Sequence, residues 1–232
     1  MSDEVVEEIL ESARMAPSAA NRQEWAFVVV RKKEIKKKIL EAIVEIETTI
    51  TRPAWKRLQV GGAPLEALAQ DLGKMTSRDI TVNNIRNQED LHELLEQYTR
   101  RGIVKMFNAD VLIAVYRKTN EEACIMTPNM YDIGAAIQNM LLTATDRGLS
   151  SLWAGGFARR DIKMEYRASG TSVRDYYRDP ISEILHAPRE MDLAALVFVG
   201  KGSSVPSVPP RKRLDEVAFL NEYGNPWKKG SG

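Results

Sequence analysis

The sequence of 232 residues contains very little cysteine and histidine. Cys124 is its only cysteine, so no disulfide can form within the chain, which favours a reducing compartment and a cytoplasmic protein. The two histidines, His92 and His186, lie far apart and have no cysteine beside them. We therefore expect neither a metal site of the usual spacing nor a Ser-His-Asp triad.

The chain also lacks a strong charge of either sign and a long hydrophobic run. Its net charge is +1, which gives no overall field that would attract nucleic acid or an anionic membrane. No apolar run approaches the roughly 18 residues of a membrane span. The acidic, amphipathic beginning "MSDEVVEEIL" is unlike a signal peptide. We expect no membrane or nucleic-acid partner.

Motifs that carry their own chemistry are absent as well. No G-x-G-x-x-G follows a strand, and no nucleophile elbow occurs. The segment "VGKGSS" at 199–204 lacks the first glycine of a P-loop and no helix pattern follows it, so it is interpreted as a turn. The sequence thus predicts no catalytic side chain; if the protein is an enzyme, a cofactor supplies the chemistry.

Hydrophobic spacing predicts helices and strands along the whole chain, which places it in the α+β class. One expected helix ends at Arg14, and three later helices cover about 35–50, 91–102 and 129–147. The expected strands are 25–30, 111–116, 151–154 and 193–200. Gly148 is predicted to cap the third of these later helices in the left-handed conformation, with Leu149 as its apolar partner. No composition break marks a second domain, so we expect one domain over 1–232 with excursions at about 51–87 and 167–179.

A dense group of hydrogen-bonding residues lies between the first helix and the first strand. Pro17, Ser18, Asn21 and Gln23 fall within "APSAANRQEW", residues 16–25. Taken alone, these residue types fit a simple turn as well as a ligand site.

This segment resembles the A-P-S-x-x-N-x-Q-P-W signature of the nitroreductase-like FMN-dependent oxidoreductases. Three further segments fit that family in the expected order: 132–157, with a long helix and a glycine loop; 183–202, with the last strand; and "RKRLDEV" at 211–217. The resemblance implies a central, mostly antiparallel sheet flanked by helices, assembled as an intertwined homodimer with two FMN molecules at the interface. Each FMN would be contacted by both subunits.

The resemblance also implies the cofactor-binding residues. Pro17, Ser18, Asn21 and Gln23 would lie along the flavin, with Asn21 hydrogen-bonded to the polar edge of the ring. A flavin has an apolar face and a polar pyrimidine edge, and a strand end rich in amides suits both.

Two further groups complete the implied site. The backbone of Gly155 and Gly156 would approach flavin N5, where a Cβ would obstruct contact; a plain strand-ending turn is the alternative. Arg211 and Arg213 would bind the phosphate through guanidinium forks, although basic tails are often merely solvated.

Two departures from the family pattern stand out. The R-R-S-x-R segment that precedes the first helix in family members, and binds the phosphate, is missing here. We expect either fewer phosphate ligands, Arg211 and Arg213 among them, or a natural N-terminus that is absent. Glu24 replaces the usual proline, and its charge is expected near the ring pocket or, preferably, in solvent.

The implied function is hydride transfer from NADH or NADPH, through flavin N5, to a small planar acceptor in a ping-pong reaction. Nitroaromatics, quinones and free flavins are such acceptors. Reductive dehalogenation, oxidative flavin fragmentation and a non-catalytic flavin-binding protein remain open alternatives.

Overall fold

A computed structural model describes residues 1–49, 88–118, 129–155, 179–203 and 209–227 of the chain. The chain divides into two compact units, Met1–Lys201 and Gly202–Gly232. Gly156 and most of the two predicted excursions lie outside the described residues. The expectation of a single domain over 1–232 stays a prediction.

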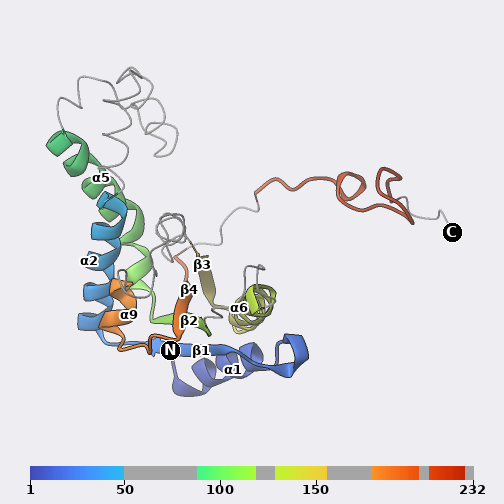
Figure 1. Ribbon diagram of the computed structural model, residues 1–232, viewed down its shortest axis with the longest axis horizontal. Helices are drawn as coiled ribbons and strands as arrows, with labels where there is room; N and C mark the ends of the chain where they lie inside the picture. The colour runs from blue at the N-terminus through green and yellow to red at the C-terminus, as the bar shows by residue number, and fades with distance from the viewer. Residues whose placement is uncertain (50–87, 119–128, 156–178, 204–208, 228–232) are drawn as a thin grey trace. The chain divides into compact units, whose positions relative to one another are not determined.

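The first unit is built around one antiparallel sheet with the strand order β1-β2-β4-β3 (Figure 1). Its described helices and strands are α1 Asp3–Arg14, β1 Trp25–Val30, α2 Lys33–Thr49, α5 Gln88–Ile103, β2 Val111–Lys118, α6 Asn129–Asp146, β3 Ser150–Ala154, α9 Pro180–Ile184 and β4 Met191–Gly200. Single turns of 3-10 helix are η1 Ala19–Asn21, η3 Met106–Asn108 and, in the second unit, η5 Leu214–Glu216. The prediction of an antiparallel sheet flanked by helices is confirmed.

The sheet separates two hydrophobic cores because successive side chains of a strand point to opposite faces. On β2, Ile113 and Val115 pack in the core that α1 and α6 cover, whereas Leu112 and Ala114 pack in the core that α2 and α9 cover. Burial on both faces explains why β2 is an almost continuous apolar run. The sheet is therefore the middle layer of the first unit.

A β-bulge interrupts the pairing of the two central strands. Val115 pairs with Ala195 and Tyr116 pairs with Leu193, so Ala194 is an extra residue on β4. Ala194 and Ala195 consequently both belong to the core beneath α1 and α6. Bulges of this kind increase the local twist and often occur beside binding sites.

The end of α6 has the predicted glycine cap. Gly148 has a φ of 68°, its N–H donates to Thr145 O at 2.9 Å, and Leu149 N–H donates to Ala144 O at 2.9 Å. These two bonds satisfy carbonyls that the helix end leaves unpaired. The cap stops α6 where the short connection to β3 begins.

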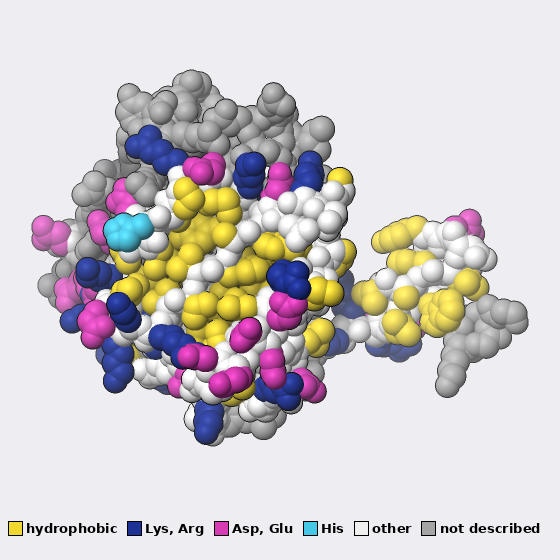
Figure 2. All heavy atoms as spheres, turned by 90° about the horizontal axis from the view of Figure 1, so that it is seen from below, with side chains coloured by type: hydrophobic (Ala, Val, Ile, Leu, Met, Phe, Trp, Pro, Cys, Tyr) yellow, Lys and Arg dark blue, Asp and Glu magenta, His cyan; other side chains and the backbone are white. Residues whose placement is uncertain are grey.

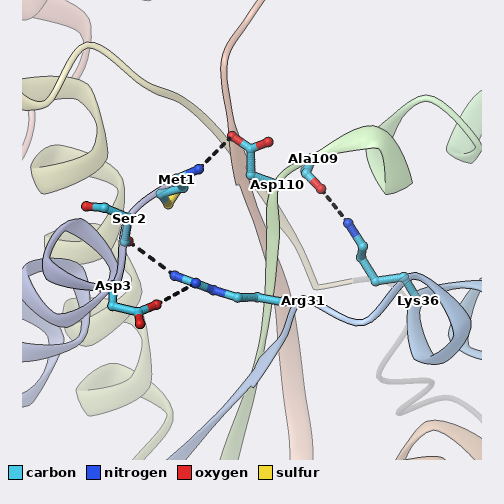
Figure 3. Close-up of polar contacts among 7 residues, drawn as sticks. All are labelled: Met1, Ser2, Asp3, Arg31, Lys36, Ala109 and Asp110. Atoms are coloured by element: carbon cyan, nitrogen blue, oxygen red, sulfur yellow. Dashed lines mark hydrogen bonds and ion pairs between the residues drawn. The ribbon is translucent and has the colours of Figure 1, made fainter.

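Polar contacts surround the C-terminal end of β1 (Figure 3). Arg31 Nη1 donates to Asp3 Oδ1 at 2.5 Å, and Arg31 Nη2 donates to Ser2 O at 3.2 Å. Lys36 Nζ, largely buried, donates to Ala109 O at 2.7 Å. Burial lowers the pKa of Lys36, while nearby Asp110 opposes that shift. These contacts attach α1 and α2 to the sheet.

Candidate functional site

The segments predicted to contact the flavin ring lie at one end of the sheet. β1 begins there, because Trp25 pairs with Arg117, and β3 ends there, because Ala154 pairs with Leu196 close to the bulge. β1 and β3 are nevertheless the two outer strands. Three strand spacings, roughly 14 Å, separate them across the sheet. Within one chain, the two predicted ring contacts share an end of the sheet but occupy its opposite edges.

Residues 18–23, here called the amide turn, form a compact loop before β1. Ser18 O accepts from Asn21 N–H at 3.0 Å, and Ser18 Oγ accepts from Gln23 N–H at 3.0 Å. Ser18 thus closes the loop with both its backbone and its hydroxyl. Pro17, Asn21 and Gln23 are exposed, so the structure brings these predicted cofactor residues together on an accessible surface.

The backbone of the amide turn is unusual. Ala20, Asn21 and Gln23 have φ values of 53°, 54° and 50°, in the left-handed region that residues other than glycine rarely adopt. Asparagine tolerates this region better than most residues, but alanine and glutamine do not. Strain of this kind persists where the surrounding structure enforces it, and it occurs preferentially at binding sites.

Two side-chain amides of the amide turn lie beside each other. Gln23 Nε2 donates to Asn21 Oδ1 at 3.0 Å, so the two amides orient each other. In the described part of the chain, Asn21 Nδ2 and Gln23 Oε1 have no hydrogen-bond partner. One donor and one acceptor therefore face solvent together, which complements a ligand edge that carries both carbonyl and N–H groups.

One residue outside the predicted set binds this turn from a distant part of the sequence. Asp132, in the first turn of α6, accepts a hydrogen bond from Ala19 N–H through Oδ2 at 3.1 Å. Sequence reasoning missed this contact because nothing in the local sequence of α6 refers to the turn. An acidic residue early in a helix was its only signal.

Glu24 was expected preferably in solvent, and that expectation is wrong. Its side chain is 15% exposed, and Oε2 is buried with no hydrogen-bond partner among the described residues. The nearest described cation is Arg22, whose Nε lies 3.8 Å from that oxygen. Glu24 also continues the β1 pairing, because its carbonyl accepts from Lys118 N–H at 3.0 Å, and this bond holds the residue beside the sheet.

Gly155 is exposed directly after β3. A Cβ built at this position would meet only Trp153 Nε1, at 3.6 Å, which is an ordinary contact. Packing among the described residues therefore gives no reason for a glycine here. A ligand that approaches the backbone closely would give one. Gly156, the other predicted glycine, lies outside the described residues.

The predicted phosphate ligands belong to the second unit, Gly202–Gly232. Arg211 Nη1 donates to the backbone oxygens of Pro209 and Pro210, at 3.2 and 3.4 Å. The guanidinium of Arg213 forms a two-pronged pair with Asp215, through Nε at 3.0 Å and Nη2 at 2.5 Å. Both arginines are exposed. Asp215 thus occupies the fork that the resemblance assigns to phosphate.

The described residues form neither a metal-binding cluster nor a membrane-spanning helix. Among the described residues, no three acidic, histidine or cysteine side chains gather as metal ligands would. None of the described helices combines the length and the apolar character that a membrane span requires.

Comparison with known proteins gives the family. A model of the nitroreductase family matches residues 1–201, which is the whole first unit. The chain belongs to the nitroreductase family.

One curated nitroreductase relative resembles a short part of this chain. Over 42 residues the chain is 55% identical to a protein of Archaeoglobus fulgidus that is provisionally named NADH dehydrogenase/NAD(P)H nitroreductase. The match covers 18% of this chain and about a quarter, 24%, of that protein.

Solved structures show the nitroreductase fold over almost the whole chain. A BluB-like flavoprotein from Clostridium difficile 630 aligns with a TM-score of 0.60 at 21% identity, covering 96% of this chain and 90% of that one. A nitroreductase with bound FMN from Bacteroides fragilis aligns at 0.54 and 16% identity, covering 96% and 89%. An iodotyrosine deiodinase bound to FMN and 3-iodo-L-tyrosine aligns at 0.53 and 17%, covering 95% and 90%. At such identities the likeness confirms the predicted fold.

Proposed function

We propose that this protein is an FMN-dependent oxidoreductase that passes hydride from NADH or NADPH to a small planar acceptor, such as a nitroaromatic, a quinone or a flavin. The observation that carries the proposal is the amide turn, with its strained backbone and its exposed donor and acceptor, in a chain of the nitroreductase family. When bound, FMN supplies the redox chemistry. The protein binds the cofactor, orients the reactants and excludes water from them.

The proposed ring contacts come from both outer strands. Asn21 and Gln23 would hydrogen-bond the polar edge of the ring, and Ser18 would keep their backbone closed. The N–H groups at Gly155 and Gly156 would stabilise negative charge that develops on the ring, as fixed donors do in other active sites. Arg211 and Arg213 would hold the phosphate, which requires Arg213 to leave Asp215.

We also propose that two copies of the chain assemble around the cofactor as a homodimer. The predicted ring contacts lie on opposite edges of one sheet, which suits a site shared between two copies. α6 supports this proposal, because Tyr131 and Leu142 project from it 73% and 59% exposed although its other side is buried in the core. Figure 2 shows a broad hydrophobic area on one face, bordered by charged side chains. Surfaces of this kind often mark interfaces.

The single cysteine favours a cytoplasmic location for the enzyme. No acid–base side chain is assigned to the reaction.

Reductive dehalogenation is the second candidate function. The likeness to the deiodinase with bound FMN and 3-iodo-L-tyrosine favours it, since the fold similarity is about as strong as that to the nitroreductase. Rates of reduction measured separately with a halogenated phenol, a nitroaromatic and a quinone would distinguish the two functions.

The absorption spectrum of the purified full-length chain tests the proposal. We expect a yellow protein, or one that turns yellow with added FMN, and loss of the visible band when NADH or NADPH is added without oxygen. A quinone or nitroaromatic should then restore the band. A yellow protein that neither nicotinamide bleaches would be a flavin-binding protein without this activity. A chain that takes up no FMN would refute both.

A further inference from the structure

Asp132 attaches the amide turn to a distant element of the first unit. Its Oδ2 accepts the Ala19 N–H at 3.1 Å, across 113 positions of sequence. The other hydrogen bonds that the described residues give to 18–23 stay inside the turn; they join Asn21, Arg22 and Gln23 to Ser18, Ala19 and Asn21. Internal bonds close a loop but leave its orientation against the sheet unspecified.

The position of this contact matters because Ala19 immediately precedes the left-handed residues. Ala20 and Asn21 follow it with positive φ, and Gln23 does so two residues later. A carboxylate that accepts the Ala19 N–H fixes the peptide plane from which these residues depart. Hydrogen bonds to an ionised acceptor are stronger than neutral ones, so Asp132 suits this purpose.

We propose that Asp132 is a positioning residue that holds the amide turn in its ligand-binding conformation. The inference rests on the proposed function, because the ligand is the flavin ring that Asn21 and Gln23 would contact. Asp132 acts through the backbone of Ala19 and does not itself touch the ring. It therefore sets how well the two amides are placed before the ligand arrives, which determines affinity through preorganisation.

A purely structural role for Asp132 must be separated from this one. An acidic side chain in the first turn of α6 also stabilises the helix by interacting with its dipole. Asn139 offers a matched control on the same helix, since its Nδ2 donates to Ser12 O at 2.9 Å and it is likewise half-buried. Asn139→Ala removes a contact between α6 and another element while leaving the amide turn untouched.

The variants are Asp132→Ala, Asp132→Asn and Asn139→Ala in the full-length chain. Asp132→Asn keeps an oxygen acceptor but loses the charge, so it should partly restore what Asp132→Ala loses. The first measurement is amide hydrogen exchange without ligand. Exchange of the turn should rise about tenfold or more in Asp132→Ala, with β1 unchanged, and should stay at the wild-type level in Asn139→Ala.

The second measurement is the dissociation constant for FMN, from flavin fluorescence. We expect it to rise roughly tenfold to a hundredfold in Asp132→Ala, less in Asp132→Asn and not at all in Asn139→Ala. Suppose that the wild type binds FMN but Asp132→Ala has the same FMN affinity, or the same amide exchange in the turn, as the wild type. That result would overturn the role of Asp132 and leave the proposed function standing. Equal losses in Asp132→Ala and Asn139→Ala would also overturn it. A wild-type chain that binds no FMN would refute the proposed function and this inference together.

Discussion

Arg213 and Asp215 are two exposed side chains whose pairing bears on the proposed phosphate site. In the structure they form a two-pronged ion pair, and Glu216 Oε2 accepts the Arg213 N–H at 2.7 Å beside it. An exposed pair of this kind contributes only about 0.2–1 kcal/mol, whereas phosphate offers two negative charges to the same fork. Phosphate should therefore displace Asp215.

The prediction at this position concerns two substitutions with opposite effects. Arg213→Ala should weaken FMN binding by about 1.5–3 kcal/mol, because a charged hydrogen bond to phosphate is lost. Asp215→Asn should tighten FMN binding by up to about fivefold, because the competing carboxylate becomes neutral. Titration of each variant with FMN measures both effects.

Riboflavin, which lacks the phosphate, is the control ligand for these variants. Neither substitution should change its affinity. If Arg213→Ala leaves FMN affinity at the wild-type value, Arg213 is not a phosphate ligand.

Residue types and order within one short segment made the amide turn predictable. Long-range contacts were not predictable in the same way. The bond from Ala19 N–H to Asp132 joins segments that only the folded chain brings together. Glu24 was misplaced because polar residues precede it directly, while its backbone bond to Lys118 holds it against the sheet. No local sequence pattern encodes either outcome.

Among the helices, α2 and α5 are joined by a charged contact. Arg100 Nη1 and Nη2 donate to Glu41 Oε1 and Oε2 at 2.9 and 2.7 Å, and Arg100 Nη2 also donates to Glu96 Oε1 at 3.0 Å. Hydrogen bonding to Arg100, more than the charge attraction itself, lowers the pKa of Glu41 below its ordinary value of 4.5.

This contact predicts a dependence of stability on acid. Because the pKa of Glu41 is lower in the folded chain, the unfolded chain binds more protons as the pH falls. The stabilisation is thus present above a pH of about 4.5 and is lost as the pH falls through the lowered pKa. Arg100→Ala should cost about 0.2–1 kcal/mol near pH 7 and less below pH 4, by urea unfolding.

Arg101→Ala, a change at the exposed neighbouring arginine, is the control. A cost of Arg100→Ala that stays constant from pH 7 to pH 3.5 would show that the Glu41 pair contributes nothing to the stability of the chain.

At the level of elements, strong hydrophobic periodicity predicted the long helices and strands, whereas a short helix was missed. β1 has the predicted bounds, and β2 is two residues longer than predicted, because polar Arg117 and Lys118 still pair with β4. α9 was missed, since five residues are too few to show a helical period. The helix begins at Pro180, and the preceding Asp179 caps it by accepting the Ile181 N–H at 3.0 Å.

For the whole molecule, the surfaces left uncovered by one chain are the informative feature. α6 is buried on one side, yet Tyr131 and Leu142, eleven residues apart and so on one helical face, are exposed. β1 is an outer strand with no described partner on its free edge, and five of its six residues are only partly buried. In the second unit, no described residue is buried. A single copy thus leaves apolar surface that a homodimer would cover.

Leu142→Glu tests that arrangement. A charge placed on the exposed face of α6 should disturb an interface there without entering the core, since Leu142 is 59% exposed in one chain. We expect light scattering to give a dimer for the wild type and a monomer for Leu142→Glu. The variant should also lose FMN, because the proposed site draws on two copies.

Val104→Glu is the control, because it changes an apolar residue that follows α5 and is 41% exposed. It should leave both the dimer and the flavin content intact. A Leu142→Glu dimer with wild-type flavin content would place the interface elsewhere, and a wild-type monomer that binds FMN would show that one chain completes the site alone.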